Sequence, residues 1–112
     1  MKIEVGQFVR LKSGYICKII NINDFREPSM KYGVEANYLK DVMFIGDDDI
    51  VKASYNIIDI LEEGDYVNNE RVEEIWKEIV LVGQECRPIS FNNIKSIVTH
   101  EQMEQMAYKV GE

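Results

Sequence analysis

Nucleophilic and metal chemistry in proteins depends largely on histidine and cysteine, and this chain has few of either. Its single histidine is His100, and its two cysteines are Cys17 and Cys86. A catalytic triad needs a histidine beside its nucleophile, and a structural zinc site needs about four ligands at suitable spacing. Because these three residues are scattered along the chain, we expect neither a zinc site nor nucleophilic catalysis, and we expect no bound cofactor.

The sequence patterns typical of calcium and phosphate sites do not occur either. Asp47, Asp48 and Asp49 are consecutive, whereas a calcium loop places its carboxylates at alternate positions and closes with a glutamate. This run is typical of a solvated turn. There is no GxxxxGK[ST] and no GxGxxG, the glycine-rich patterns that bind phosphates. Carboxylates are abundant, but none stands in a context that indicates acid–base catalysis, so we expect that the protein is not an enzyme.

Binding chemistry is better represented, because several aromatic side chains stand near arginines in the sequence. An aromatic face together with a guanidinium group can hold a nucleobase and a phosphate, or another planar anion. The alternative for each pair is ordinary packing, with the arginine reaching out to solvent. The ligand-binding residues that this pattern predicts are Phe25, Arg26, Tyr32, Arg71, Trp76 and Arg87.

An internal repeat is the clearest sign of the elements that must position these side chains. Residues 3–9 read IEVGQFV, and residues 61–67 read LEEGDYV. Each copy contains a glycine, Gly6 or Gly64, that allows a backbone geometry other residues resist. A short turn and a second apolar run follow, so we expect an antiparallel hairpin in each copy. The alternative is two unrelated hairpins that use common turn chemistry.

The rest of the chain indicates short strands, turns and one helix. Thr99 followed by Gln102 fits a capping box, so we expect a helix from His100 to Ala107 and a short final strand at Tyr108 and Val110. Pro88 confines the strand near it to a sheet edge. The remaining expectations are a loop over 24–33, a strand over 34–45, a turn over 46–49, short strands or a strand and a 3₁₀ turn over 50–53 and 57–61, one apolar run over 71–82, a turn over 83–85 and a strand over 94–98.

The order glycine, any residue, aromatic residue, valine, then a turn and a curved strand, resembles the opening of SH3-like and Tudor-like small barrels. We therefore expect a mainly β fold: a small SH3-like antiparallel barrel or barrels, or a β-sandwich, built from two related hairpin units with one short C-terminal helix. Phe8 and Tyr66 should fill the core. Residues 1–112 should form a single β-rich domain, with repeat-like units that start near residues 3 and 61.

Three segments are together similar to small proteins of phages and prophages of Gram-positive, especially clostridial, bacteria. They read EVGQFVRLKSGYICKI, YNIIDILEEGDYVNNERV and IKSIVTHEQMEQMAYKVGE. The resemblance implies a phage accessory protein in the host cell cytoplasm that acts by binding. One class of such proteins is a sponge that sequesters the nucleotide second messengers of antiphage immunity. By context, the resemblance implies a cyclic nucleotide or ADP-ribose-type ligand held by a homo-oligomer.

Charge supports a second hypothesis. The formal charge of −7 repels phosphate backbones, so it argues against nucleic-acid binding, although residues 1–23 sum to +3. Residues 62–85 hold eight acidic residues against Arg71 and Lys77. This block is read either as a solvated face or as the docking surface of an acidic adaptor that inhibits a host or phage protein.

The chain start and the cysteines indicate a location. The first residues contain no long apolar region, and the longest apolar runs, such as Ile79 to Val82, are far short of a membrane span, so we expect a cytoplasmic protein with no membrane attachment. Without a signal peptide, buried reduced thiols at Cys17 and Cys86 are expected in preference to a disulfide.

Overall fold

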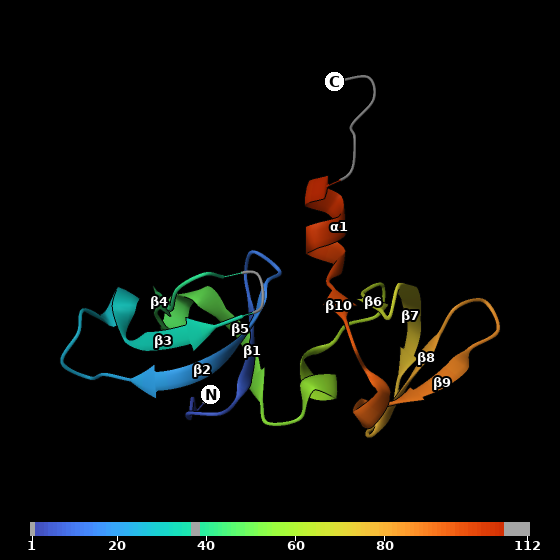
Figure 1. The fold of residues 1–112 in the computed structure, drawn as a ribbon, viewed down its shortest axis with the longest axis horizontal. Coiled ribbons are helices and arrows are strands. Elements are labelled where there is room, and N and C mark those ends of the chain that lie inside the picture. Colours follow the sequence, from blue (N-terminus) through green and yellow to red (C-terminus); the bar gives the residue numbers. More distant parts are fainter. Residues whose placement is uncertain (1, 37–38, 107–112) are drawn as a thin grey trace, which may run out of the picture. The chain divides into compact units, whose positions relative to one another are not determined.

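The computed structural model describes residues 2–36 and 39–106, and these fall into two compact units. The first unit spans residues 1–60 and the second spans residues 61–112. The boundary lies at Leu61, where the second copy of the sequence repeat begins. Each unit contains its own antiparallel sheet of five strands (Figure 1). The mainly β fold expected from the sequence is therefore confirmed.

The first unit has the strand order β4-β3-β2-β1-β5, with every neighbouring pair antiparallel. Three short 3₁₀ helices interrupt or follow the strands. The elements are β1 (Phe8–Leu11), β2 (Ile16–Ile22), η1 (Pro28–Met30), β3 (Tyr32–Glu35), β4 (Met43–Ile45), η2 (Asp47–Asp49), β5 (Ile50–Ser54) and η3 (Ile57–Ile60).

The second unit has the order β10-β6-β7-β8-β9, again with every neighbouring pair antiparallel. Its strands are followed by a short α-helix. The elements are β6 (Tyr66–Val67), β7 (Glu70–Ile75), β8 (Ile79–Val82), β9 (Arg87–Ser90), η4 (Phe91–Asn93), β10 (Ile97–Val98) and α1 (His100–Met106).

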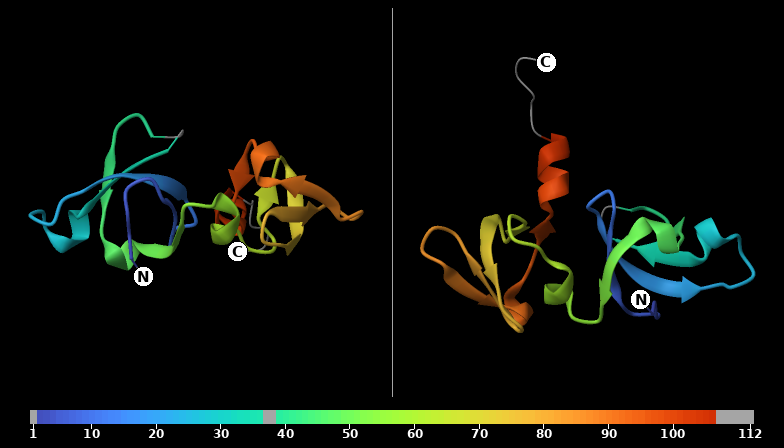
Figure 2. Two further views of the ribbon diagram at one scale, coloured as in Figure 1. Left: turned by 90° about the horizontal axis from the view of Figure 1, so that it is seen from below. Right: turned by 180° about the vertical axis from the view of Figure 1, so that it is seen from behind.

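The two sheets share one topology. In each unit the first strand lies between the second and the fifth, and the third and fourth strands follow outward from the second. A 3₁₀ turn, η2 or η4, joins the fourth strand to the fifth in each. The same strand order occurs in both units, so the repeat in the sequence is also a repeat of the fold. Figure 2 shows the strands of each unit from two further sides.

Residues 4–7 and 62–65 form a turn that we call the repeat turn. It makes the same set of hydrogen bonds in both units. In the first copy Gly6, at φ +94°, donates its N–H to Ile19 O over 2.8 Å. Ile19 N–H donates to Gln7 O over 2.9 Å, and the Gln7 side-chain oxygen accepts the N–H of Glu4 over 2.8 Å. A positive φ of this size favours glycine, which explains why the repeat keeps this residue type.

The second copy reproduces these bonds with different side chains. Gly64, at φ +93°, donates to Val72 O over 2.9 Å, and Val72 donates to Asp65 O over 2.7 Å. The Asp65 carboxylate accepts the N–H of Glu62 over 2.7 Å. The two hairpins are therefore one structural repeat, and the alternative of two unrelated hairpins is wrong.

The core of each unit is mainly aliphatic, and in β1 and β6 the valine that follows the expected aromatic residue is buried instead. Val9 and Val67 have no exposed surface, whereas Phe8 and Tyr66 are only half-buried. The prediction that the two aromatics fill the core is therefore wrong, because strand alternation turns the valines inward. The buried apolar residues are Val9, Leu11, Cys17, Ile19, Tyr32, Val34, Ile45, Ile50, Ile58 and Ile60 in the first unit, and Leu61, Val67, Val72, Val80, Val82 and Ile89 in the second.

One buried cation accompanies the core of the first unit. Arg10 in β1 has no exposed surface, and its guanidinium donates to the carbonyl oxygen of Ile60 over 3.2 Å. A buried guanidinium is costly unless its N–H groups are bonded, so this contact fastens η3 to the sheet.

Several element boundaries differ from those expected. The segment 34–45 contains two antiparallel strands, β3 and β4, because the chain reverses between Glu35 and Met43. The run 71–82 likewise breaks at Trp76 into β7 and β8, and the pairing of these two strands shifts its register between Val72 and Glu74. The strand expected over 94–98 is reduced to β10. The turns at 46–49 and 83–85, the strand–3₁₀ pair from residue 50 and the edge position of Pro88 are confirmed.

The capping box at the start of α1 is confirmed. Thr99 donates its N–H to the Gln102 side-chain oxygen over 2.9 Å, and Gln102 donates its own N–H to Thr99 Oγ1 over 3.3 Å. The helix has no buried residue, and Met103 and Met106 are exposed. Ala107 and the strand expected at Tyr108 and Val110 lie outside the described residues.

The structure also bears on membrane-spanning helices and on the two cysteines. The described residues contain no helix with the length and hydropathy needed to cross a lipid bilayer. Both cysteines are free thiols; Cys17 is buried as expected, but Cys86 is exposed in the turn before β9.

We predict that Gly64→Ala destabilises the second unit by about 1 to 2 kcal/mol, because a Cβ strains a backbone at this φ. Trp76 is the only tryptophan in the chain and lies in the second unit, so its fluorescence during urea unfolding reports this change. Gln84→Ala, in an exposed turn of the same unit, is the control. Equal midpoints for Gly64→Ala and the wild type would contradict the role given to this glycine.

Candidate functional site

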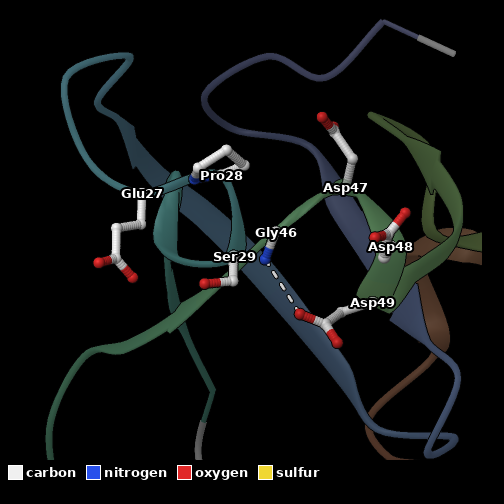
Figure 3. Close-up of a pocket in the computed structure, with 7 residues that line it drawn as sticks. All are labelled: Glu27, Pro28, Ser29, Gly46, Asp47, Asp48 and Asp49. Atoms are coloured by element: carbon white, nitrogen blue, oxygen red, sulfur yellow. Dashed lines mark hydrogen bonds between the residues drawn. The ribbon is translucent and has the colours of Figure 1, made fainter.

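The first unit carries a cleft of about 560 Å³ between η1 and η2. Its walls come from two short segments, residues 27–29 and 46–49. Figure 3 shows Glu27 on one side of Gly46 and the three aspartates on the other. The cleft is in the size range of ligand sites in proteins. The lining residues are Glu27, Pro28, Ser29, Gly46, Asp47, Asp48 and Asp49.

Gly46 lets the two walls approach each other. A Cβ on this residue would lie 2.3 Å from the carbonyl oxygen of Pro28 and 2.8 Å from Cα of Ser29, both of which are backbone atoms. On the other wall, Asp49 accepts the N–H of Gly46 over 3.0 Å and donates its own N–H to Gly46 O over 3.1 Å. The close approach and this reciprocal cap fix the shape of the cleft.

Tyr32 supports the wall of the cleft that carries the aspartates. This side chain is buried in the core, and its hydroxyl donates to the Asp47 carboxylate over 2.6 Å. Burial, and then the Asp47 carboxylate, raise the pKa of the Tyr32 phenol above its ordinary value of 10.0. Asp47 is therefore held in place by a neutral donor, and its charge is not cancelled by this contact.

The electrostatics of the cleft are acidic. Four of its seven lining residues carry carboxylates, and none of them is basic. Glu27 and Asp48 are exposed, and Glu27 makes no side-chain cap to η1. Lys31 lies nearby: it pairs with Asp24 over 3.4 Å, and Tyr32 and Asp24, with a smaller contribution from Asp47, raise its pKa above the ordinary value. The cleft therefore attracts positively charged groups.

The aromatic and arginine residues predicted in the first unit do not form one site. The Phe25 ring is fully exposed, at 101%. Arg26 lies instead over the ring of Phe44, with its guanidinium carbon 4.1 Å from the ring centre. Tyr32 is buried and turned towards Asp47. The structure places these three residues around the loop before β3, but none of their rings and guanidinium groups pair with one another as expected.

The predicted residues of the second unit lie on the sheet formed by β7, β8 and β9. The Arg71 guanidinium pairs with Glu73 over 2.9 Å, and this carboxylate raises the pKa of Arg71 above its ordinary value. Arg87 pairs with Glu70. Trp76 is 55% exposed at the turn between β7 and β8. Both arginines already hold carboxylates, so an anionic ligand would have to displace these partners.

The second unit presents different chemistry at the position that corresponds to the cleft. There the turn between its second and third strands carries Trp76, and η4 begins with Phe91, which donates its N–H to Glu78 O over 3.2 Å. Trp76 and Phe91 are both exposed, at 55% and 49%. The duplicated scaffold therefore offers carboxylates in one unit and aromatic rings in the other.

A cluster that the sequence did not predict joins the repeat turn of the second unit to α1. The side chains of Glu62, His100 and Glu101 bring three donor atoms within 4.8 Å of one another. The spacing of 38 residues between Glu62 and His100 hid this contact. Two signals pointed towards it: the Thr99 cap placed His100 at the helix start, and the repeat made Glu62 the counterpart of Glu4.

Comparison of the chain with protein-family models, with curated proteins and with solved structures gave no match.

We predict that Gly46→Ala destabilises the first unit by about 1 to 3 kcal/mol, because η1 must move away from the new Cβ. Far-UV circular dichroism during urea unfolding measures this loss. Ser29→Ala, an exposed change on the opposite wall, is the matched control and should leave the midpoint unchanged. A Gly46→Ala midpoint equal to that of the wild type would show that the walls are not held this closely.

The raised pKa of Tyr32 leads to a prediction for the pH dependence of stability. Because its pKa is raised in the fold, the unfolded phenol ionises first as the pH rises above about 10, and stability falls there. Tyr32→Phe should lower the free energy of unfolding by about 1 kcal/mol at pH 8, because one hydrogen bond is lost. Between pH 8 and pH 11 this variant should lose less stability than the wild type. Tyr66→Phe, in the other unit, is the control. If the wild type lost as little stability as Tyr32→Phe between pH 8 and pH 11, the role given to the Tyr32 hydroxyl would be contradicted.

Proposed function

We propose that this protein is a binding protein that acts without catalysis, and that the cleft of the first unit docks a basic segment of a partner protein. The observation that carries this proposal is the composition of the cleft: four carboxylates and no basic side chain among its lining residues. A chain with a formal charge of −7 adds a long-range field of the same sign. Such a field speeds the approach of a basic partner and repels a nucleic acid.

The exposed carboxylates of the cleft give the partner its chemistry. Asp47 and Asp49 have structural partners in Tyr32 and in the backbone of Gly46. Glu27 and Asp48 have no ion pair with another residue that the structure describes, and both face solvent. Lysine or arginine side chains of an extended segment fit these two positions, because a guanidinium or ammonium group supplies several N–H donors to a carboxylate.

The hypothesis of a nucleotide sponge receives less support from the geometry. In this hypothesis the guanidinium groups of Arg26, Arg71 and Arg87 hold the phosphates, but they contact Phe44, Glu73 and Glu70 respectively. Its stacking residues include Tyr32, which is buried. Nucleotide binding, the phage origin, the anti-defence role and the oligomeric state stay predictions. Thermal melts against cyclic nucleotides and ADP-ribose derivatives test the first of these.

A charge-neutralising pair of substitutions tests the proposed function. Glu27→Gln with Asp48→Asn should weaken the binding of a fluorescein-labelled oligolysine peptide by about threefold or more, measured by fluorescence anisotropy at low salt. The wild-type affinity should also fall as salt is added, because exposed charges are screened.

The matched control removes the same charge elsewhere. Glu85→Gln with Glu104→Gln changes two exposed carboxylates of the second unit and should weaken binding much less. Equal losses in the two double variants would mean that net charge alone attracts the peptide, and the cleft would then have no special part in docking.

A further inference from the structure

We propose that Glu62, His100 and Glu101 form a site for a divalent transition-metal ion such as Zn²⁺. Within residues 2–36 and 39–106, this is the one group of at least three histidine, cysteine, aspartate or glutamate side chains whose donor atoms converge to within 4.8 Å. It lies wholly in the second unit, at the junction of the repeat turn and α1. It is separate from the acidic cleft, so it does not depend on the proposed docking function.

The distances within the cluster fit metal coordination. His100 Nε2 lies 2.9 Å from Glu62 Oε1 and 3.4 Å from Glu101 Oε1. Ligand atoms about 2.1 Å from a tetrahedral zinc ion are about 3.4 Å apart, and slightly closer in an octahedral shell. A small adjustment of these side chains would therefore place all three donor atoms around one ion.

The donor set selects the class of metal. One imidazole nitrogen and two carboxylate oxygens suit zinc and neighbouring transition metals, whereas calcium and magnesium prefer oxygen ligands alone. Three protein ligands would leave a further position for water.

The backbone at the site is fixed from within. Asp65 has no exposed surface, and its carboxylate accepts the N–H of Glu62 over 2.7 Å and the N–H of His100 over 2.9 Å. One buried carboxylate thus holds the main chain of two ligands, and the Thr99–Gln102 capping box holds the start of α1. Such support lowers the entropy cost of assembling a metal site.

Solvent can reach the cluster. The side chains of His100, Glu62 and Glu101 are 36%, 30% and 27% exposed. The nearby guanidinium of Arg71 lies 3.7 Å from where a Gly64 Cβ would stand, but it is paired with Glu73. An ion can therefore enter without unfolding the unit.

The first copy of the repeat provides an internal comparison. There Glu4 takes the place of Glu62, and Tyr55 packs over Gly6 as His100 packs over Gly64. Burial and the adjacent Glu4 raise the pKa of the Tyr55 phenol, and its hydroxyl contacts Val5 O over 3.4 Å. A neutral phenol is a poor ligand for zinc, so the same scaffold lacks the metal site in the first unit. The histidine is what distinguishes the second.

Titration of the metal-stripped full chain with Zn²⁺, followed by isothermal calorimetry, tests this site. A Cys86→Ser background removes the exposed thiol, which would otherwise offer zinc a sulfur ligand. We expect one zinc ion per chain, no binding of Mg²⁺, and a higher thermal midpoint for the second unit, read from Trp76 fluorescence. His100→Gln should abolish binding, and Glu101→Gln should weaken it more than about tenfold.

The equivalent change in the first unit is the control. Tyr55→Phe should leave zinc affinity unchanged, and circular dichroism should show that His100→Gln keeps its strands. Absence of one-to-one binding in the parent chain would overturn the proposal, and the cluster would then be a histidine–glutamate ion pair only. Zinc binding that survives His100→Gln in a folded chain would overturn it equally.

Discussion

The repeat turn is the constraint on which both units depend. A glycine at φ +94° or +93° lets the chain turn sharply, and its N–H and the next residue's carbonyl pair with a single residue of the second strand. The side chain after the glycine, Gln7 or Asp65, closes the turn by accepting a backbone N–H. These bonds set the register of the first hairpin, and the other three strands of each sheet add outward from it. Everything that differs between the units is built on this shared frame.

The chemistry of the two units diverges at a few positions of that frame. Replacement of the amide at Gln7 by a carboxylate at Asp65 gives the second turn an additional acceptor, which holds the first N–H of α1. At the position of Tyr55 in the first unit, the second unit has His100, so an imidazole stands where the first unit has a phenol. At the other end of the sheet, the aspartates of η2 are replaced by Phe91 and asparagines in η4. The first unit thereby presents carboxylates at this position, and the second presents exposed aromatic rings there and the cluster of Glu62, His100 and Glu101 at its repeat turn.

Patterns of a few adjacent residues predicted the fold well, because the turns and caps that they specify form between neighbours in the sequence. The glycine in each repeat copy, the Thr99 capping box and the edge position of Pro88 each follow from the chemistry of a few adjacent residues. The segments 34–45 and 71–82 each contain two strands, but neither contains a glycine or a proline that would mark a turn between them. Side-chain partners were harder to predict. Arg71 and Arg87 stand near aromatics in the sequence, but Arg71 pairs with Glu73 in its own strand, and the folded sheet brings Glu70 of β7 beside Arg87 of β9. Glu62 and His100 met through tertiary packing across 38 residues, a contact that no spacing rule describes.

Docking of a basic segment in the cleft is the central claim of this account, and mapping by nuclear magnetic resonance tests it most directly. Addition of an unlabelled oligolysine peptide to the ¹⁵N-labelled chain should shift the amide signals of Glu27, Ser29 and residues 46–49 more than any others. Those of the acidic block at 62–85 should move little. The largest shifts falling in that block, or spread evenly over both units, would contradict the account, because binding would then follow net charge and not the shape that Gly46 gives the cleft.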